Sequence, residues 1–218
     1  MKRTIILGAI LSLLNVALPA GEKPILKFNG KNLTGFYNYL GKAKNQDPDQ
    51  VFSVTDEGLL RISGQHPGYL STIKKLSDYR MVAEFKWGEG DKSSDSGIFF
   101  HAADPDKLWA KSLEVQMRSG ATGDLCLIGK GAALTTKGQS WTKGCIPRPG
   151  NNDEDIENPR GTYNTIELIC KGDTVRVTLN GKIILVGTGA HRKSGRIFFQ
   201  SYSGELFYRK IVFYPLQD

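Results

Sequence analysis

Apolar and polar side chains alternate along most of the chain from Pro24 onward, in short runs separated by Gly, Asn and Asp. A period of two is typical of β-strands, and no segment shows the sustained 3.6-residue period of an amphipathic helix. Asn180-Gly181 is the strongest hairpin signal, because both residues tolerate the positive φ of a type I′ turn. The pattern predicts an all-β fold of two packed sheets, with strands at residues 25–28, 51–54, 58–63, 79–87, 96–102, 112–118, 123–129, 163–170, 174–180, 182–187, 196–202 and 206–216.

Two neighbouring strands place reactive side chains on one face of a predicted sheet. In SLEVQMR, Glu114 and Gln116 alternate with apolar residues, so they lie opposite the face that joins the core. In the preceding strand, SGIFFHA, the same alternation places Phe99 and His101 on one face. A carboxylate, an amide and an imidazole on adjacent strands indicate a site for a small molecule.

The first residues are typical of a secretory signal peptide. Two basic residues precede an apolar run over residues 5–18, which is too short for a membrane span, and the small Ala20 is suited to cleavage. We predict a signal peptide over residues 1–20 and a single domain over residues 21–218, which is a suitable length for one β-sandwich. The mature chain is then periplasmic or secreted and has no membrane span.

The charge of the chain does not predict a nucleic-acid partner. The formal net charge is +7, and loss of the two basic residues of the signal peptide leaves 29 minus two basic residues against 22 acidic ones, or +5. These side chains are dispersed and form no stripe that would track phosphates. The acidic stretch over residues 151–158 lacks the ligand spacing and central Gly of an EF-hand, so we predict a solvated loop.

Three cysteines in an exported chain leave at least one unpaired. Cys126 and Cys145 flank a Gly-rich segment, and the sequence leaves open whether a disulfide joins them. Cys170 lies in a predicted strand, where a buried thiol is the ordinary state. We predict no cofactor. The sequence leaves open whether carboxylates and His101 hold a divalent metal ion, although no ligand spacing requires one.

Two long insertions interrupt the strands, at residues 102–111 and roughly 130–161. Loops of such length in a compact domain are usually functional or disordered. Both adjoin the strands that carry His101, Glu114 and Gln116, and this position favours a functional role.

Several segments in collinear order, among them LKFNGKNLTGF, FSVTDEGLLRISG, SDSGIFFHA, LEVQMRSGATGDLCLIG and GRIFFQSYSGELFYRKIVFYPL, carry a family resemblance. Over nearly the whole mature chain the sequence resembles the 3-keto-disaccharide hydrolase family, also described as 3-keto-glucoside 1,2-lyases and 3-keto-2-hydroxy-glucal hydratases. The resemblance implies a concanavalin A-like jelly-roll β-sandwich that binds sugar on a concave sheet face.

The chain departs from the family pattern at three places. The family's Asn-Ser-Gly is Asp95-Ser96-Gly97 here, and the Trp of its aromatic-Trp-Asn-Thr segment is Tyr163. His101 stands where many members carry Arg. These differences bear on substrate preference and not on the fold.

The chemistry that the resemblance implies is an elimination. A keto group at carbon 3 of a glucoside acidifies the hydrogen at carbon 2, so a base can remove that proton and the group at carbon 1 is expelled. The resulting 2-hydroxy-3-keto-glucal then takes up water. Such a site requires a base that works near neutral pH, a donor to the enolate oxygen and an acid for the leaving group.

Five residues are candidates for proton transfer or for polar contacts with the sugar. His101 is the first candidate for the base, because imidazole titrates near neutral pH; a hydrogen-bonded strand histidine is the alternative. Glu114 could be base, acid or the residue that orients His101. Gln116 suits sugar hydroxyls or an enolate oxygen. Asp95 and Asp124 could each bind a hydroxyl or cap a turn.

Further candidates lie in the long loops and the last strands. Trp109 and Trp141 could stack on a pyranose ring or pack within their loops. Lys143 could polarise the ketone or simply be solvated. Gln200 and Tyr202 alternate in FFQSY and are expected on the same face as the carboxylate.

The sequence thus predicts an exported enzyme that cleaves 3-keto-glycosides by elimination and hydration, with His101 and Glu114 as catalytic residues and a small-molecule glycoside or oligosaccharide as partner. A non-catalytic, lectin-like carbohydrate-binding module is the competing class, because fold alone does not decide activity. An ordinary glycosidase is a further alternative. It requires two carboxylates across the scissile bond, and because Glu114 has no second carboxylate on its own strand, Asp95, Asp124 or Glu84 would have to supply it from another strand.

Overall fold

The structure is a computed structural model that describes residues 23–90, 93–103, 106–149 and 156–216; the predicted signal peptide lies outside this part. All regular elements in the described part are β-strands. Within it there is no helix long and apolar enough to cross a membrane.

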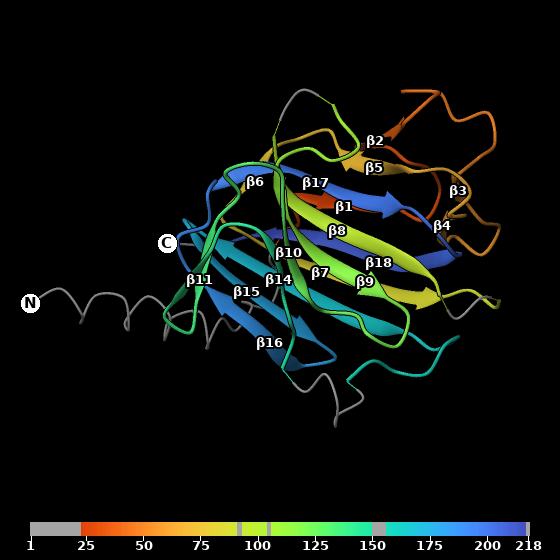
Figure 1. Cartoon of the computed structure of the whole chain (residues 1–218). Coiled ribbons are helices and arrows are strands. Elements are labelled where there is room, and N and C mark those ends of the chain that lie inside the picture. Colours follow the sequence, from red (N-terminus) through yellow and green to blue (C-terminus); the bar gives the residue numbers. More distant parts are fainter. Residues whose placement is uncertain (1–22, 91–92, 104–105, 150–155, 217–218) are drawn as a thin grey trace, which may run out of the picture.

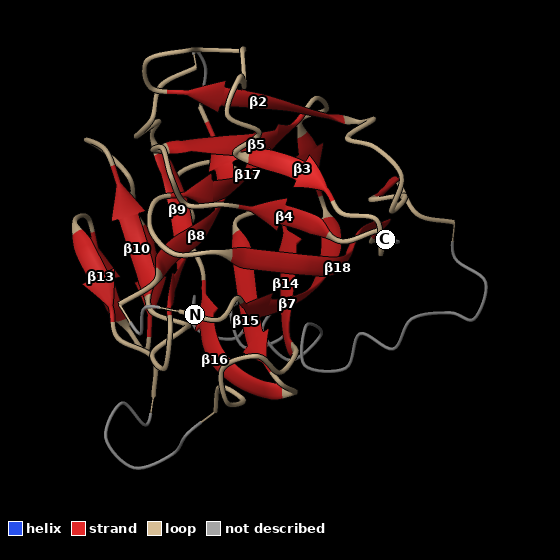
Figure 2. Cartoon of the chain, turned by 90° about the vertical axis from the view of Figure 1, so that its right-hand side faces the viewer, coloured by secondary structure: helices blue, strands red, loops and turns tan. Residues whose placement is uncertain are grey.

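Two antiparallel sheets form the molecule (Figure 1). We call them sheet A and sheet B, and Figure 2 shows their strands as two layers. Sheet A has the order β16 (Lys182–Gly187), β15 (Thr174–Leu179), β14 (Asn164–Lys171), β7 (Tyr79–Trp87), β18 (Leu206–Pro215), β4 (Leu60–Ile62), β3 (Phe52–Val54), with β1 (Leu26–Lys27) beside β18. Sheet B has the order β13 (Gly144–Ile146), β10 (Leu125–Ile128), β9 (Ser112–Arg118), β8 (Asp95–Ala102), β17 (Ser194–Ser201), β5 (Gly68–Thr72), β2 (Phe36–Leu40), with β6 (Leu76–Ser77) beside β17; β11 (Leu134–Thr136) and β12 (Gln139–Trp141) form a separate hairpin.

The main core lies between the two sheets and is built from the alternate apolar residues that the sequence pattern indicates. Phe85, Trp87 and Phe213, three large side chains of sheet A, are buried there. They face apolar residues of sheet B such as Ile98 and Val115. Burial of apolar surface, at about 25 cal/mol per Å², is the main force that holds the layers together.

All twelve predicted strand segments contain strands, and the predicted turns occur between them. Asn180-Gly181 joins β15 to β16 with φ angles of 50° and 81°, as a type I′ turn requires. Strands β2, β5 and the two-residue β6 were not predicted. The predicted loop over residues 130–161 contains three further strands, β11, β12 and β13.

Part of the predicted solvated loop over residues 151–158 is buried. The Glu157 carboxylate accepts hydrogen bonds from Nε1 of Trp87 at 2.8 Å and from the backbone N–H of Thr122 at 3.0 Å. Ile156 joins the main core. The prediction is therefore wrong for these two residues, while positions 151–155 lie outside the described residues. Glu157 connects this segment to both sheets.

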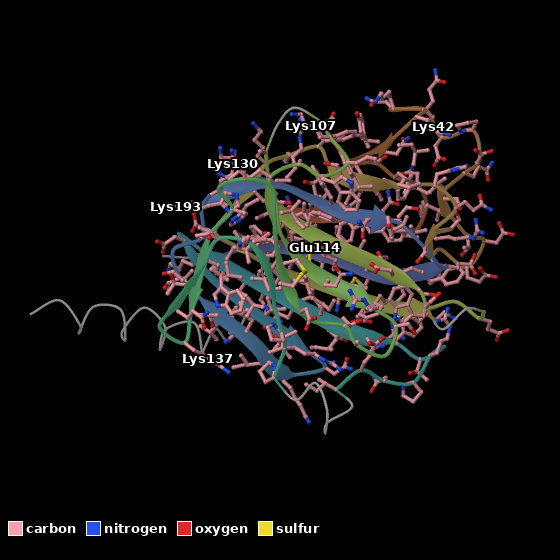
Figure 3. All side chains as sticks on the ribbon, in the orientation of Figure 1. Lys42, Lys107, Glu114, Lys130, Lys137 and Lys193 are labelled. Atoms are coloured by element: carbon pink, nitrogen blue, oxygen red, sulfur yellow. A yellow bond between two sulfur atoms is a disulfide. The ribbon has the colours of Figure 1, made fainter. Side chains whose placement is uncertain are left out.

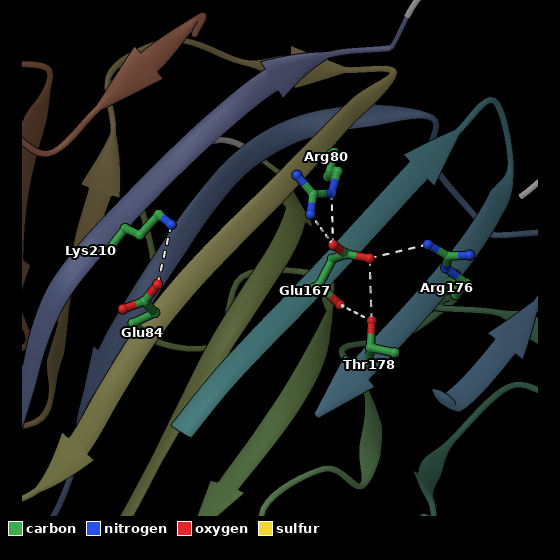
Figure 4. A network of polar contacts seen from close by, with 6 residues as sticks. All are labelled: Arg80, Glu84, Glu167, Arg176, Thr178 and Lys210. Carbon is green, nitrogen blue, oxygen red and sulfur yellow. Dashed lines mark hydrogen bonds and ion pairs between the residues drawn. The ribbon is translucent and has the colours of Figure 1, made fainter. Parts of the chain in front are cut away.

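The outer face of sheet A carries paired charges (Figure 4). Glu167 accepts a hydrogen bond from Nε of Arg80 at 2.7 Å and lies 3.1 Å from Nη2 of Arg176. Glu84 lies 3.2 Å from Nζ of Lys210. These carboxylates are neutralised by cations on neighbouring strands, so this face is polar but electrostatically satisfied.

Candidate functional site

The outer face of sheet B carries the reactive side chains. Strand pairing places Glu114 of β9 directly between Phe99 of β8 and Cys126 of β10, and Cys126 opposite Cys145 of β13. Cys126 and Cys145 form a disulfide, which confirms one of the two possibilities that the sequence left open, and Cys170 is a buried free thiol as predicted. Figure 3 shows Glu114 in the middle of this face beside the disulfide.

The carboxyl group of Glu114 lies over Gly97, in a gap that only glycine leaves open. A Cβ atom on Gly97 would lie 2.0 Å from Oε1 of Glu114 and 2.9 Å from its Cδ. The Glu114 residue is 3% exposed. The Gly of the Asp95-Ser96-Gly97 segment therefore makes room for the carboxyl group of the next strand.

The surroundings of Glu114 favour its neutral form. Burial is the main cause, and the nearby charge of Asp95 adds to it, whereas Arg118 opposes them; together they raise the pKa of Glu114 to about 8. No side chain in the described part donates a hydrogen bond to this carboxyl group. A carboxyl group with such a pKa exchanges protons readily near neutral pH, which general acid–base catalysis requires.

The amide of Gln116 is held in one orientation. Its Nε2 donates to Oδ1 of Asp95 at 2.7 Å and to the carbonyl oxygen of Ser96 at 3.3 Å. Both N–H groups are thereby engaged, and Oε1 is left to accept a hydrogen bond. Asp95 lies next to the site but binds Gln116, and its Oδ2 is 3.8 Å from Nε of Arg118. Gln116 thus fits a sugar hydroxyl better than an enolate oxygen.

Exposed aromatic rings border the carboxyl group on the side of β8 and β17. The Trp109 ring lies 6.2 Å from the Phe99 ring and 6.0 Å from the Tyr202 ring, measured between ring centres. Trp109 is 51% and Tyr202 47% exposed, so both rings are accessible to a ligand. Gln200 is buried on the same face, and its Oε1 has no hydrogen-bond partner in the described part. The structure thus brings these three predicted residues to the site.

His101 does not lie on this face, because β8 contains a β-bulge. Phe99 pairs with Phe198 and Ala102 with Arg196, so β8 has one more residue than β17 between these two pairs. The extra residue breaks the alternation of side chains. His101 adopts a φ of 53°, in a left-handed region that residues other than glycine rarely occupy. The predicted shared face of His101 and the carboxylate is therefore wrong.

The imidazole of His101 is instead an interior group. Its ring packs edge-on against Tyr79 of sheet A, with 6.0 Å between ring centres, and its Nδ1 donates to the carbonyl oxygen of Arg192 at 2.9 Å. Burial lowers the pKa of His101 to about 4, so the ring is neutral at pH 7. The structure therefore supports the alternative interpretation, a hydrogen-bonded strand histidine. It gives no geometric support to a role of His101 as the base.

The other predicted residues lie outside the immediate surroundings of Glu114. Asp124 Oδ1 accepts a hydrogen bond from the backbone N–H of Arg148 at 2.9 Å, so it fixes a neighbouring segment. Lys143 is exposed in the connection between β12 and β13. Trp141 packs against the main core, as loop packing would predict.

The sequence did not indicate a second group of residues on this face. Tyr69 stacks on Phe198, with 3.9 Å between ring centres, and on Tyr39, with 5.3 Å. Asp106 accepts hydrogen bonds from the hydroxyl groups of Tyr37 and Tyr69 at 2.5 and 3.1 Å. The alternating tyrosines of GFYNYL were the available signal, because β2 places both on one face of the sheet.

The described part of the chain contains no group of three or more His, Cys, Asp and Glu side chains that could hold a metal ion. The chemistry of this face is therefore built from one buried carboxyl group, two amides and aromatic rings.

Comparison with known proteins identifies the family. Residues 23–213 match the model of the 3-keto-alpha-glucoside-1,2-lyase-like domain. The chain belongs to this family. Membership supports a carbohydrate-active function and confirms the resemblance seen in the sequence. No curated protein matches the sequence.

Solved structures share the fold of this family member. A protein of Parabacteroides distasonis, described as a candidate glycosyl hydrolase, has a TM-score of 0.63 and 16% identity over 87% of this chain and 92% of that chain. The carbohydrate-binding module CBM66 of Bacillus subtilis has a TM-score of 0.56 and 12% identity, over 84% and 97%. A β-glucanase of Bacillus licheniformis has a TM-score of 0.58 and 14% identity, over 88% and 98%. The predicted concanavalin A-like jelly-roll sandwich is confirmed.

Proposed function

We propose that the chain cleaves 3-keto-glycosides by elimination across carbons 1 and 2, followed by hydration of the 2-hydroxy-3-keto-glucal, and that Glu114 is the group that transfers the proton. The observation that carries this proposal is a buried carboxyl group without a cationic hydrogen-bond partner, placed over Gly97 beside exposed aromatic rings. Ion-paired carboxylates such as Glu167 are less suited to the role, because their cations stabilise the charged form.

In the proposed reaction the carboxylate of Glu114 removes the proton from carbon 2, and the electron pair moves into the enolate of the carbon 3 ketone. Collapse of the enolate expels the group at carbon 1, which leaves as an alcohol once it takes up a proton, either from the newly protonated Glu114 or from water. Addition of water at carbon 1 and of a proton at carbon 2 then gives the free 3-keto sugar. Glu114 ends the cycle as a carboxylate.

The other residues of the face bind the sugar in this proposal. Oε1 of Gln116 accepts a hydrogen bond from a sugar hydroxyl, since its N–H groups are engaged with Asp95 and Ser96. The amide of Gln200 is buried on the same face, and its Oε1 has no hydrogen-bond partner in the described part, so it is the second candidate to accept a hydrogen bond from the ligand. Trp109 and Tyr202 present exposed rings on which a pyranose can stack.

The disulfide between Cys126 and Cys145 supports the further proposal that the chain is exported to the periplasm or secreted. Disulfides persist in oxidising compartments and are rare in the cytosol. The signal peptide predicted from the sequence leads to the same expectation.

The decisive experiment incubates the mature domain with a 3-keto-glucoside and, separately, with its unoxidised parent, and follows the aglycone and the glucal by mass spectrometry. In heavy water, hydration of the glucal should introduce deuterium at carbon 2 of the 3-keto sugar. Turnover of the keto form alone supports the proposal. Cleavage of the parent would instead support a two-carboxylate glycosidase, and binding of either compound without turnover would support a carbohydrate-binding module.

A matched pair of variants tests the role of Glu114. Glu114→Gln keeps the shape of the side chain but cannot take a proton, so turnover should be lost while the glycoside is still bound. Glu89→Gln makes the same change at an exposed position and should leave turnover unaltered. Full turnover by Glu114→Gln would show that another group removes the proton.

A further inference from the structure

Residues 106–111, which precede β9, lie on the outer face of sheet B, over β17 and β5 (Figure 1). They bury the aromatic rings of the sheet below. Ala110 packs with Phe99 and Phe198 in a second, smaller apolar cluster. Trp109, the residue before Ala110, carries the exposed ring that contacts Phe99, the strand partner of Glu114. The position of this ring therefore depends on how the connection is held.

Asp106 connects this segment to three side chains of the sheet. Its Oδ1 accepts hydrogen bonds from the hydroxyl groups of Tyr37 at 2.5 Å and of Tyr69 at 3.1 Å, and lies 3.5 Å from Nη1 of Arg196. Burial and the bond to Asp106 raise the pKa of Tyr37 to about 12, so this hydroxyl stays a donor over the physiological pH range. The three contacts come from β2, β5 and β17.

Trp109 follows three residues later, and within the described residues its side chain is held by ring contacts with Phe99 and Tyr202 alone. Such contacts between aromatic rings are weak. Hydrogen bonds to a charged acceptor are stronger and more directional. The hydrogen bonds of the Asp106 carboxylate therefore hold the 106–111 segment more firmly than the ring contacts of Trp109 do.

We propose that Asp106 is a positioning residue, which fixes the 106–111 segment through Tyr37 and Tyr69 and so holds the Trp109 ring where it contacts the sugar. This inference rests on the proposed function, because it assigns Trp109 to the same sugar site. Asp106 itself lies with the tyrosines and does not take part in proton transfer. It sets the affinity for the ligand and not the rate of the chemical step.

The first test measures the segment itself and requires no substrate. Lys107 is exposed in the middle of the segment, so trypsin can cleave after it once the segment is released. We expect cleavage after Lys107 to be at least about tenfold faster in Asp106→Ala than in the wild type, and intermediate in Tyr37→Phe. Asp56→Asn, at an exposed turn of sheet A, is the control and should match the wild type. Equal cleavage in all variants would overturn the proposal.

The second test measures the consequence for the ligand, with a 3-keto-glucoside as the probe. Asp106→Ala should raise KM about tenfold and change kcat by no more than about twofold. The reason is that the contact between Trp109 and the sugar is lost equally in the ground state and in the transition state. In a Trp109→Ala background the same change should raise KM no further, since the two residues act through one contact. A fall in kcat with unchanged KM, or additive effects of the two substitutions, would refute the positioning role.

The two tests fail in different ways. If the wild type binds the keto-glucoside without turnover, the proposed reaction is wrong, and the dissociation constant replaces KM in the same comparison. If it neither binds nor converts the sugar, the sugar site is wrong and with it the role of Asp106 in affinity. Circular dichroism shows whether Asp106→Ala is folded. If this variant does not fold, Asp106→Asn takes its place in both tests. Because Asn keeps an acceptor for both tyrosines, its trypsin cleavage and its KM should be close to those of the wild type.

Discussion

The stability of Glu114→Gln relative to the wild type should increase as the pH rises. The pKa of Glu114 in the folded protein is about 8, against an ordinary value of 4.5. Between these two values the folded protein retains a proton that the unfolded chain releases. The stability associated with the protonated carboxyl group is therefore complete below pH 4.5 and is lost as the pH rises through about 8.

The size of the effect follows from the same two values. Each pKa unit corresponds to about 1.4 kcal/mol, so the interval from 4.5 to about 8 amounts to about 5 kcal/mol. This is a large part of the total stability of a typical domain, about 5–15 kcal/mol. Glutamine keeps the shape and never ionises. Its amide lacks a partner here, which costs about 1–3 kcal/mol at every pH and leaves the pH dependence unchanged.

The assay is urea unfolding of the wild type and of Glu114→Gln, followed by tryptophan fluorescence, from about pH 5 to about pH 9. The difference in unfolding free energy should shift in favour of the variant by about 1.4 kcal/mol per pH unit up to about pH 8. Other titrating groups, including His101, are common to both proteins and cancel in this difference. Glu89→Gln, at an exposed position, should run parallel to the wild type.

Parallel curves for the wild type and Glu114→Gln would refute the reasoning. They would mean that the carboxylate is as well solvated or as well paired in the folded protein as in the unfolded chain. The same result would remove the physical basis for a base that works near neutral pH. A difference of the opposite sign would indicate an unrecognised cation beside the carboxyl group.

Three further predictions concern residues next to this carboxyl group or in the bulge. His101 has a pKa of about 4 in place of 6.5, so its contribution to stability is present above pH 6.5 and lost as the pH falls through about 4. Urea unfolding should show a loss of about 3 kcal/mol over this interval in the wild type and a smaller one in His101→Asn; equal losses would contradict it. Gly97→Ala places a methyl group 2.0 Å from Oε1 of Glu114 and should reduce turnover of the keto-glucoside at least about tenfold, with an unchanged circular dichroism spectrum. Replacing Cys126 and Cys145, 19 residues apart, with Ser should lower the unfolding free energy by about 3 kcal/mol and abolish the effect of a reductant, whereas an unchanged urea midpoint would show that the bridge adds no stability.

Strands with one face in the core could be predicted from alternation, but β2 and β5 could not. Every residue of β5 is buried, because the core covers one face and residues 106–111 lie over the other. Its sequence, GYLST, has polar Ser71 and Thr72 among the buried positions and so shows no alternation of apolar and polar residues. In β2, the polar Asn38 shares one face with the buried Phe36 and Leu40, so that face is not uniformly apolar either. The pattern fails where polar residues stand among the buried positions of a strand.

The site could be predicted in part for the same reason. Glu114 and Gln116 obey the alternation of an undistorted strand, so their face was correct. His101 lies within a β-bulge, and one extra residue is enough to turn a side chain to the other face. The hydrogen bonds between Asp106 and the tyrosines join residues from separate segments of the chain. No local pattern reports such contacts, which arise only when the strands pair.

The two outer faces show why a catalytic carboxylate is expected on sheet B and not on sheet A. Burial alone would raise the pKa of Glu84, but hydrogen bonds from Arg209 and Lys210 outweigh it and lower that pKa. Glu114 is buried without such donors, so burial prevails and its pKa rises to about 8. The difference therefore lies in the deeper burial of Glu114 as well as in its lack of cationic partners. A carboxylate held by cations is a poor base at neutral pH, because the protonation that elimination requires would have to break its ion pairs.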